Sequence, residues 1–400
     1  MRILQVLPRY APAWSYGGGV RMFWYLACEL TRLGHEVRVV TSDSVNANTR
    51  TPDLRETLEG GIKVTRYRNR FNRLSAQAGA LFYRPRGMRL GVRSEAEWAD
   101  VIHMGESRGI HNVWAAEAAG ATGVPLVWSA YGGLPTASGV RGVYRKVYDI
   151  AFTKSVIANV ERFIAQTDHE SSVYVGHGAP PDRIRLIPLC VDTEAFATPP
   201  ERGRFRRQLG LAQDDLLVVC VARLSPVKGM DLLIDAFARL PAQVHGPYLA
   251  LVGWNHGAEP ALRAQVKRLK LDGRVLFPGA LLGEDRLLAY IDADVFALTP
   301  AVYEETSLAA LEAAALGIPT VLTAECEIPL MNEAGAGVVA ERSGAGVAAA
   351  LSRLLADGAT RVAMGSRAKD LVFERFGVNS IARQHEAVFE EVVRTSVARE

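Results

Sequence analysis

The chain has 400 residues, of which 49% are hydrophobic and 22% are charged, and its formal net charge is +3. This composition is typical of a soluble globular protein. Because a single core rarely grows beyond ~250–300 residues, the length predicts two domains. The apolar run before Pro8 is too short for a secretory signal or a membrane span, so we expect a cytoplasmic protein. The four cysteines lack the spacing of a zinc site or a disulfide framework.

Strand-like apolar runs alternate with helical patterns from the first residue onward. In the first half the strand-like runs are RILQVL, EVRVVTS, VIHM, VPLVWSA and RFIAQT. Prolines and a glycine interrupt the pattern near residue 190, and it restarts with LLVVCVARL, YLALVG, VLFPG, VFALTP and PTVLTA. This rhythm predicts an α/β fold with two Rossmann-like, doubly wound parallel sheets.

The interruption near residue 190 sets the predicted domain boundary. We expect residues 1–190 and 191–379 to form the two domains and residues of about 380–400 to form a long last helix. The short link suggests that the two sheets face each other across a cleft. Because ligands bind at the carboxyl ends of strands in such sheets, the loops after ILQVL, VCVARL and VFALTP are the candidate functional loops.

A triple glycine, residues 17–19, opens the helix that follows the first strand. Glycines let a ligand approach the backbone, and the start of a helix offers free N–H groups to an anion. A flexible turn is the other interpretation. The spacing is neither GxGxxG nor that of a P-loop, which argues against a dinucleotide or ATP site.

Residues 63–93 form a basic segment with nine Lys and Arg and no acidic residue. Apolar side chains such as Phe71, Leu74, Leu81 and Phe82 are interleaved with the charges. Such a segment is typical of contact with an anionic membrane surface or an anionic acceptor, and a solvated basic loop is the alternative. No recognised motif favours nucleic acid. The basic residues expected at a membrane are Lys63, Arg66, Arg68, Arg70, Arg73, Arg84, Arg86 and Arg89.

The loop after the first strand of the second half, RLSPVKG, contains Arg223 and Lys228. Two cations at the carboxyl end of a strand suit a diphosphate, which Arg can bind with two hydrogen bonds and Lys as a point charge. A solvated loop is the alternative for either residue alone. A helix predicted from Ser307 to Leu316 would point its N-terminus toward the same edge, which favours a phosphate site.

Glu312 lies on the apolar stripe of this predicted helix, and Glu304 lies in the loop before it. A buried carboxylate must find a hydrogen-bond partner, from the protein or from a ligand. The two oxygens of a carboxylate can accept hydrogen bonds from the vicinal hydroxyls of a sugar. A diphosphate flanked by two sugars would therefore account for the cations, the helix and both glutamates.

Five motifs, in this order, make the chain resemble the retaining GT-B glycosyltransferases of family 4 (group 1), which use nucleotide-sugar donors. They are the glycine-rich loop, GHEVRVVTS, IPLCVDTEAF, RLSPVKG and the E-x7-E element that ends at Glu312. The resemblance implies an acceptor-binding first domain, a donor-binding second domain and a last helix that packs back on the first. It implies no metal and no other cofactor. The implied donor-binding residues are Gly18, Gly19, Arg223, Lys228, Glu304, Ser307, Leu308 and Glu312.

Within this set, the resemblance assigns the donor diphosphate to Arg223 and Lys228, the ribose to Glu312 and the transferred sugar to Glu304. Arg223, Lys228 and Glu304 are then the expected catalytic residues. Tyr131 departs from the family pattern, because many members have a histidine there that contacts donor or acceptor. Residues 305–307 also replace a commoner glycine-aromatic-glycine loop. The DAD run at residues 292–294 resembles a metal-binding DxD but sits at a helix end before a buried strand, so we assign it no metal role.

The predicted function is retaining transfer of a sugar from a nucleoside-diphosphate sugar to the hydroxyl of a lipid-linked or saccharide acceptor. We expect a role in cell-envelope polysaccharide, lipopolysaccharide or glycolipid synthesis at the inner face of the membrane. A nucleotide-sugar epimerase or a phosphorylase on the same fold is one alternative. A non-catalytic nucleotide-sugar-binding protein is another.

Overall fold

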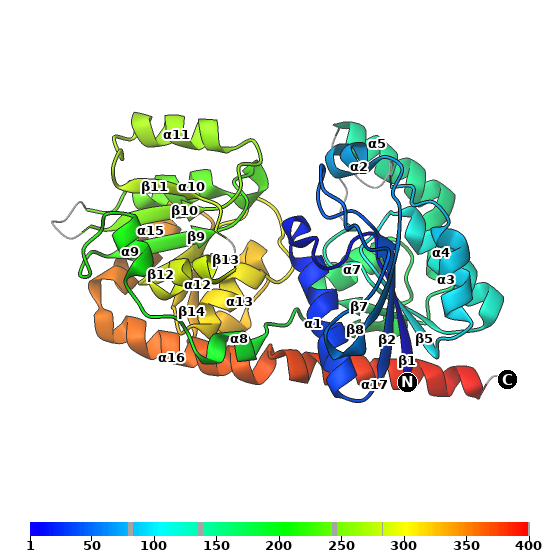
Figure 1. The fold of residues 1–400 in the computed structure, drawn as a ribbon. Helices are drawn as coiled ribbons and strands as arrows, with labels where there is room; N and C mark the ends of the chain where they lie inside the picture. The colour runs from blue at the N-terminus through cyan, green and yellow to red at the C-terminus, as the bar shows by residue number, and fades with distance from the viewer. Residues whose placement is uncertain (79–82, 135–138, 242–245, 282, 399–400) are drawn as a thin grey trace. The chain divides into compact units, whose positions relative to one another are not determined.

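The computed structural model describes residues 1–78, 83–134, 139–241, 246–281 and 283–398. Leu81 and Phe82 of the basic segment lie outside these residues. The chain forms two compact units: Met1–Cys190 together with the residues from Val378 onward, and Val191–Gly377. Figure 1 labels their helices and strands. No helix among the described residues combines the length and the apolar character needed to cross a membrane.

The first unit contains an eight-stranded sheet in the order β3-β4-β2-β1-β5-β6-β7-β8. All its pairings are parallel except the short edge strand β3, which runs antiparallel to β4. From β1 the chain builds one side of the sheet and then crosses to β5 on the other side, so β1 and β5 flank the switch point. The strands are β1 Arg2–Val6, β2 Glu36–Ser42, β3 Arg55–Thr57, β4 Lys63–Tyr67, β5 Val101–Gly105, β6 Leu126–Ser129, β7 Arg162–Ala165 and β8 Ile184–Leu186.

Helices cover this sheet, and the last helix of the chain is one of them (Figure 1). Helix α17 packs against α1 and β5, because its residues Ile381, Val388 and Phe389 form a buried stripe at helical spacing. The main helices are α1 Gly18–Arg32, α2 Asn72–Ala78, α3 Met88–Ala96, α4 Ile110–Thr122, α5 Gly139–Tyr148, α6 Lys154–Ala158, α7 Asp168–Gly176 and α17 Val378–Val397, with a π-helical turn, η4 Asp149–Thr153, between α5 and α6.

The second unit contains a six-stranded, all-parallel sheet in the order β11-β10-β9-β12-β13-β14. Strands β9 and β12 flank its switch point, and they are buried on both faces, which explains their continuous apolar sequences. The strands are β9 Leu217–Val221, β10 Tyr248–Val252, β11 Val275–Gly279, β12 Val295–Leu298, β13 Thr320–Thr323 and β14 Gly337–Ala340. The helices are α8 Thr193–Ala197, α9 Arg204–Gln208, α10 Met230–Phe237, α11 Glu259–Arg268, α12 Glu284–Ile291, α13 Leu308–Ala315, α14 Leu330–Glu333, α15 Gly344–Ala356 and α16 Gly358–Arg375.

The predicted fold class, two Rossmann-like parallel sheets, is confirmed. The expected cleft between the sheets stays a prediction. The DAD run has a structural position in the second unit. Asp292 accepts hydrogen bonds from the backbone N–H groups of Gly203 and Arg206, and Asp294 forms an ion pair of 2.7 Å with the buried guanidinium of Arg206. These carboxylates therefore hold α9 against the start of β12.

Replacing Arg206 with leucine is expected to destabilise the second unit, because Asp294 loses its buried cation. Removing one partner of a buried ion pair costs ~3–5 kcal/mol. Arg202 also contacts Asp294, at 3.4 Å, but its side chain is 52% exposed. Arg202→Leu is therefore the matched control and should cost less than ~1 kcal/mol. Urea unfolding measures both free energies, and equal losses would contradict the role assigned to Arg206.

Candidate functional site

The loops that follow β9 and β12 meet at the carboxyl edge of the second sheet. Thr299 donates its hydroxyl to the carbonyl of Gly229 at 2.8 Å, and the N–H of Ala301 donates to the carbonyl of Val227 at 2.9 Å. A Cβ added to Gly229 would lie 1.8 Å from the carbonyl oxygen of Thr299, and the φ of Gly229 is +62°. Only glycine permits this approach of two backbones. The two predicted loops therefore form one surface.

Lys228 and Glu304 face each other on this surface. Their side chains form an ion pair of 2.5 Å, and they are 14% and 22% exposed. The backbone N–H of Glu304 donates to the carbonyl of Glu325 at 2.7 Å, which fixes the loop. Within the described part of the chain, Oε2 of Glu304 is buried and has no hydrogen-bond partner. The pair thus carries one cation and one unused carboxylate oxygen, which are available to a ligand that separates them.

Arg223 lies in the loop after β9, on the same edge, and this loop is hydrogen-bonded to the loop after β10. The N–H of Leu224 donates to the carbonyl of Trp254 at 2.8 Å, and the N–H of His256 donates to the carbonyl of Leu224 at 2.9 Å. Burial lowers the pKa of His256, and the nearby charge of Arg223 lowers it further.

The loop before α13 has a strained backbone. Thr306 is buried and has a φ of +45°, which costs of order 1–3 kcal/mol for a residue with a side chain. Ser307 caps the helix by accepting a hydrogen bond from the N–H of Ala310. The predicted helix is confirmed, since α13 begins at Leu308. The first amides of α13 have no partner within the helix, so they can bind an anion at the end of the loop that carries Glu304.

Glu312 is held by the protein itself. One guanidinium nitrogen of Arg286, Nη1, lies 2.5 and 2.6 Å from its two carboxylate oxygens, and the hydroxyl of Tyr290 donates to Oε2 at 2.9 Å. These contacts fix the orientation of the buried carboxylate of Glu312 on α13. The sequence did not identify Arg286 or Tyr290, although their spacing of four places both on one face of α12.

The first unit carries the other predicted site residues. Gly17 has a φ of +100° and caps α1, and a Cβ at Gly19 would meet no atom within 4 Å, so the start of this helix is open. Tyr131 follows β6 with a φ of +46°, and its ring packs on Phe23 of α1 at 5.4 Å. Burial raises the pKa of Tyr131, which keeps its hydroxyl neutral. The contact of Gly18 and Gly19 with a donor, and of Tyr131 with an acceptor or the donor sugar, stays a prediction.

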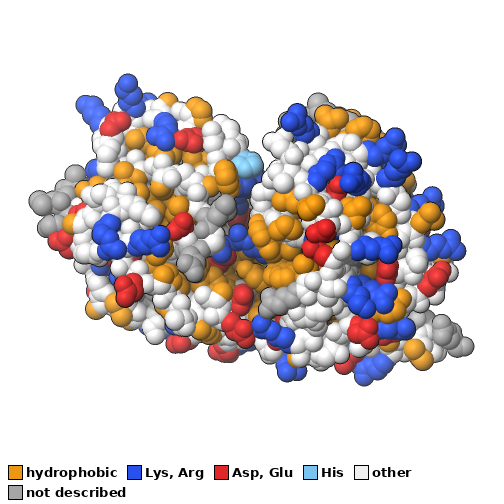
Figure 2. All heavy atoms as spheres, in the orientation of Figure 1, with side chains coloured by type: hydrophobic (Ala, Val, Ile, Leu, Met, Phe, Trp, Pro, Cys, Tyr) orange, Lys and Arg blue, Asp and Glu red, His pale blue; other side chains and the backbone are white. Residues whose placement is uncertain are grey.

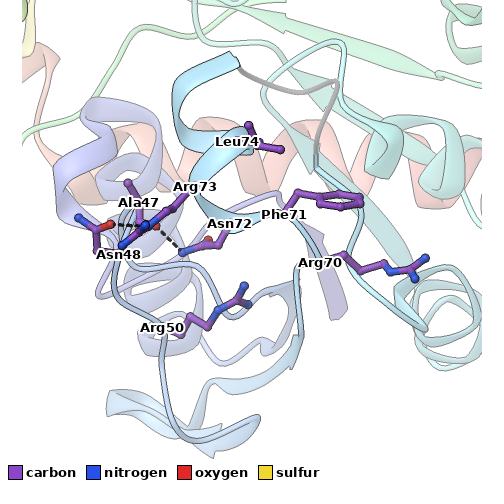
Figure 3. Close-up of a pocket in the computed structure, with 8 residues that line it drawn as sticks. All are labelled: Ala47, Asn48, Arg50, Arg70, Phe71, Asn72, Arg73 and Leu74. Atoms are coloured by element: carbon purple, nitrogen blue, oxygen red, sulfur yellow. Dashed lines mark hydrogen bonds between the residues drawn. The ribbon is translucent and has the colours of Figure 1, made fainter.

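The basic segment lines a pocket of about 390 Å³ in the first unit (Figure 3). Arg50 is already bound to Asp43 and to the carbonyl of Asn69, each at 2.8 Å, and Arg73 donates to Asn48 at 3.0 Å. Figure 3 shows Arg70 and Phe71 on the same side of the pocket. The lining residues are Ala47, Asn48, Arg50, Arg70, Phe71, Asn72, Arg73 and Leu74.

The predicted membrane contact of Arg66 is wrong. Arg66 is 3% exposed and forms an ion pair with Glu56, and its guanidinium donates to the carbonyl of Ala11 at 2.6 Å. It shares the buried face of β4 with Val64, two residues earlier. Its guanidinium therefore links β4 to β3 and to the loop after β1, and it cannot reach a membrane.

Family comparisons agree with this arrangement. The family described as Glycosyltransferase Family 4 matches residues 16–195, and the family described as Glycosyl transferases group 1 matches residues 201–371. The chain therefore belongs to the family 4, group 1 glycosyltransferases. The two matches cover the two Rossmann-like units in turn.

Two curated relatives named D-inositol 3-phosphate glycosyltransferase are similar to part of the chain. The protein of Acidothermus cellulolyticus is 31% identical over 255 residues, which cover 58% of this chain and 54% of that protein. The protein of Kineococcus radiotolerans is 31% identical over 264 residues, which cover 61% of this chain and 60% of that protein. The chain thus spans a little over half the length of these relatives.

Solved structures share the fold. HepE of Anabaena, in complex with UDP and glucose, has a TM-score of 0.77 and 22% identity, and the match covers 98% of this chain and 100% of that one. WaaG, a glycosyltransferase involved in lipopolysaccharide biosynthesis, has a TM-score of 0.69 and 18% identity, covering 97% and 99%. These likenesses confirm the GT-B fold.

Replacing Arg286 with leucine is expected to weaken both stability and nucleotide binding, because the buried carboxylate of Glu312 loses its cation. The free energy of unfolding should fall by ~3–5 kcal/mol. Arg286→Lys keeps the positive charge and should therefore retain part of the stability and part of the nucleotide binding. The exposed ion pair of Arg263 and Glu259 on α11 offers a control, and Arg263→Leu should cost less than ~1 kcal/mol. Urea unfolding measures the loss of stability, and titration calorimetry with UDP measures the loss of nucleotide binding. Unchanged UDP affinity in Arg286→Leu would contradict the predicted contact of Glu312 with the ribose.

Proposed function

We propose that the protein transfers a sugar from a nucleoside-diphosphate sugar to an acceptor hydroxyl and keeps the anomeric configuration. The observation that carries this proposal is the ion pair of Lys228 and Glu304 beside the start of α13 at the switch point of the second sheet. A cation, free amides and a carboxylate with a spare oxygen suit a diphosphate next to a sugar. Family membership and the relatives' names support the same activity.

In the proposed reaction, donor binding exchanges the partners of Lys228. A donor phosphate takes the ammonium group, and Glu304 is released to accept hydrogen bonds from the hydroxyls of the transferred sugar. Arg223, Lys228 and the amides of α13 then stabilise the negative charge that develops on the leaving diphosphate. These groups supply the charge stabilisation that a metal ion provides in other enzymes, so we propose a metal-independent enzyme.

Retention follows in this proposal from attack on the face that the diphosphate leaves. The bond between the anomeric carbon and the phosphate oxygen breaks as the acceptor oxygen bonds to that carbon. The leaving phosphate oxygen takes the acceptor's proton, so no enzymic base is needed. Glu304 holds the sugar during this exchange and does not become covalently attached.

We further propose that the acceptor carries an anionic group. The pocket of the basic segment presents Arg70 next to apolar Phe71 and Leu74, a set that suits a phosphorylated polyol or saccharide. The names of the curated relatives, which refer to an inositol phosphate, support this choice. A lipid-linked acceptor in cell-envelope synthesis stays a prediction.

The test of the activity is release of nucleoside diphosphate with and without acceptor. UDP-, GDP- and ADP-sugars are each incubated with D-inositol 3-phosphate and with simple saccharides. A transferase releases the diphosphate only with an acceptor. Release without acceptor, turnover of the donor sugar into its epimer, or binding without turnover would each contradict the proposal and favour an alternative class.

Lys228→Ala is expected to weaken binding of the accepted nucleoside diphosphate by about 10–100-fold, because a charged hydrogen bond of ~1.5–3 kcal/mol is lost. Binding of the corresponding nucleoside should not change, since it has no phosphate. Lys267→Ala, at an exposed position of α11, is the control. Titration calorimetry measures the affinities of Lys228→Ala for the nucleoside diphosphate and for the nucleoside, and the affinity of Lys267→Ala for the nucleoside diphosphate. If Lys228→Ala binds the nucleoside and the nucleoside diphosphate with equally reduced affinity, Lys228 does not bind the diphosphate.

Arg70→Ala is expected to raise the KM for a phosphorylated acceptor by about tenfold and to leave the KM for the donor unchanged. Unphosphorylated inositol, if it is used as an acceptor, should be insensitive to the change. Initial-rate kinetics measure these constants. If Arg70→Ala leaves the KM for the phosphorylated acceptor unchanged, the pocket is not the binding site of that acceptor.

A further inference from the structure

The helix formed by α5, η4 and α6 exposes an aliphatic ridge. Val143 is 64% exposed, Val147 is 59% exposed and Ile150 is 85% exposed. Steps of four and three residues place these side chains on one helical face. Figure 2 shows hydrophobic side chains flanked by Lys and Arg at the upper edge of this unit, where Figure 1 places α5. We call Val143, Val147 and Ile150 the apolar ridge.

The opposite face of this helix is anchored through polar groups. The hydroxyls of Tyr144 and Tyr148 donate to the carbonyls of Arg108 and Gly109 at 2.9 and 3.0 Å. Asp149 accepts two hydrogen bonds of 2.9 Å from the guanidinium of Arg108. A helix of a globular protein normally turns its aliphatic ridge toward the core. In α5 and η4 two tyrosines and an ion pair face inward, and Val156 and Ile157 of α6 supply the buried apolar side chains. Core packing therefore does not account for the apolar ridge.

The border of the apolar ridge is basic. Lys146 and Lys154 are exposed at positions that continue the same helical face, three residues after Val143 and four after Ile150. Residues 139–158 contain a single acidic residue, Asp149, and Arg108 already neutralises it. An aliphatic face with a cationic border is typical of a helix that lies in the plane of an anionic membrane surface.

We propose that this helix docks the protein on an anionic lipid bilayer, with the apolar ridge inserted below the headgroups and the two lysines among them. A second copy of the chain fits the ridge less well. Three aliphatic side chains cover far less than the ~800 Å² per partner that a stable interface buries, and the lysines of two copies would repel each other.

Docking through this helix has a direct structural connection to the sheet. Arg108 and Gly109, which hold its tyrosines and Asp149, belong to the loop after β5 at the switch point of the first unit. A bilayer bound at the apolar ridge therefore lies beside the edge of the sheet at which ligands bind in this class of fold. The basic segment lies nearby, since the ring of its Tyr83 lies 5.7 Å from that of His111, two residues after Gly109.

The experiment is sedimentation of the full-length protein with lipid vesicles at low salt, without donor or acceptor, so its outcome does not depend on the proposed function. One set of vesicles is phosphatidylcholine, and the other contains about one third phosphatidylglycerol. The protein is expected to bind the vesicles that contain phosphatidylglycerol and not the vesicles of phosphatidylcholine. The triple variant Val143→Ser, Val147→Ser, Ile150→Ser should bind the anionic vesicles at least about tenfold more weakly. The matched control is Val362→Ser, Val397→Ser, two positions outside the basic segment that are 75% and 68% exposed, and it should bind like the unchanged protein.

A charge variant tests the basic border separately. Lys146→Glu, Lys154→Glu should weaken binding by at least about fivefold per residue, whereas Lys267→Glu, Arg268→Glu on α11 should not. Equal binding to both vesicle types, or anionic-vesicle binding by the triple-serine variant at full strength, would overturn the proposal. A dimer of the unchanged protein that the triple-serine variant abolishes, measured by light scattering, would overturn it in favour of a second copy.

Discussion

The contact of Gly229 with Thr299 is the constraint on which the candidate site depends. At this point the backbone after β9 lies directly on the backbone after β12, without a side chain between them. The contact fixes the height of Lys228 above the sheet and thereby its reach to Glu304. A side chain at position 229 would push the two loops apart and separate Lys228 from Glu304.

The charges of this site are satisfied within the protein before any ligand arrives. Lys228 has Glu304, and Glu312 has Arg286 and Tyr290. Such pairing keeps the side chains oriented and avoids the cost of isolated charges in a poorly hydrated place. It also means that a ligand gains only the difference between its own contacts and the contacts it replaces. A ligand with a phosphate group for Lys228 and hydroxyl groups for Glu304 replaces both sides of that ion pair at once, which favours specificity over raw affinity.

The fold could be predicted from the sequence because its signals are local. Continuous apolar runs such as LVVCV and VFAL mark strands buried on both faces, and Ser307 before α13 marks a helix start. The partners of Glu312 could not be predicted, because Arg286 reaches it only through the packing of α12 against α13, which no local pattern encodes. Arg66 was misjudged for a related reason, since counting charges in the basic segment ignored the alternation that turns Arg66 inward with Val64.

Helix α17 gives the first unit an unusual order of assembly. The helix comes last in the chain, yet it packs against α1 and β5, and the ring of Phe389 lies 5.3 Å from that of His103 in the middle of β5. During synthesis, residues 1–190 emerge first but lack this cover until the final helix has left the ribosome. The apolar face of α1 thus stays open while the whole second unit is made. The C-terminus, rather than the N-terminus, decides when the first unit is finished.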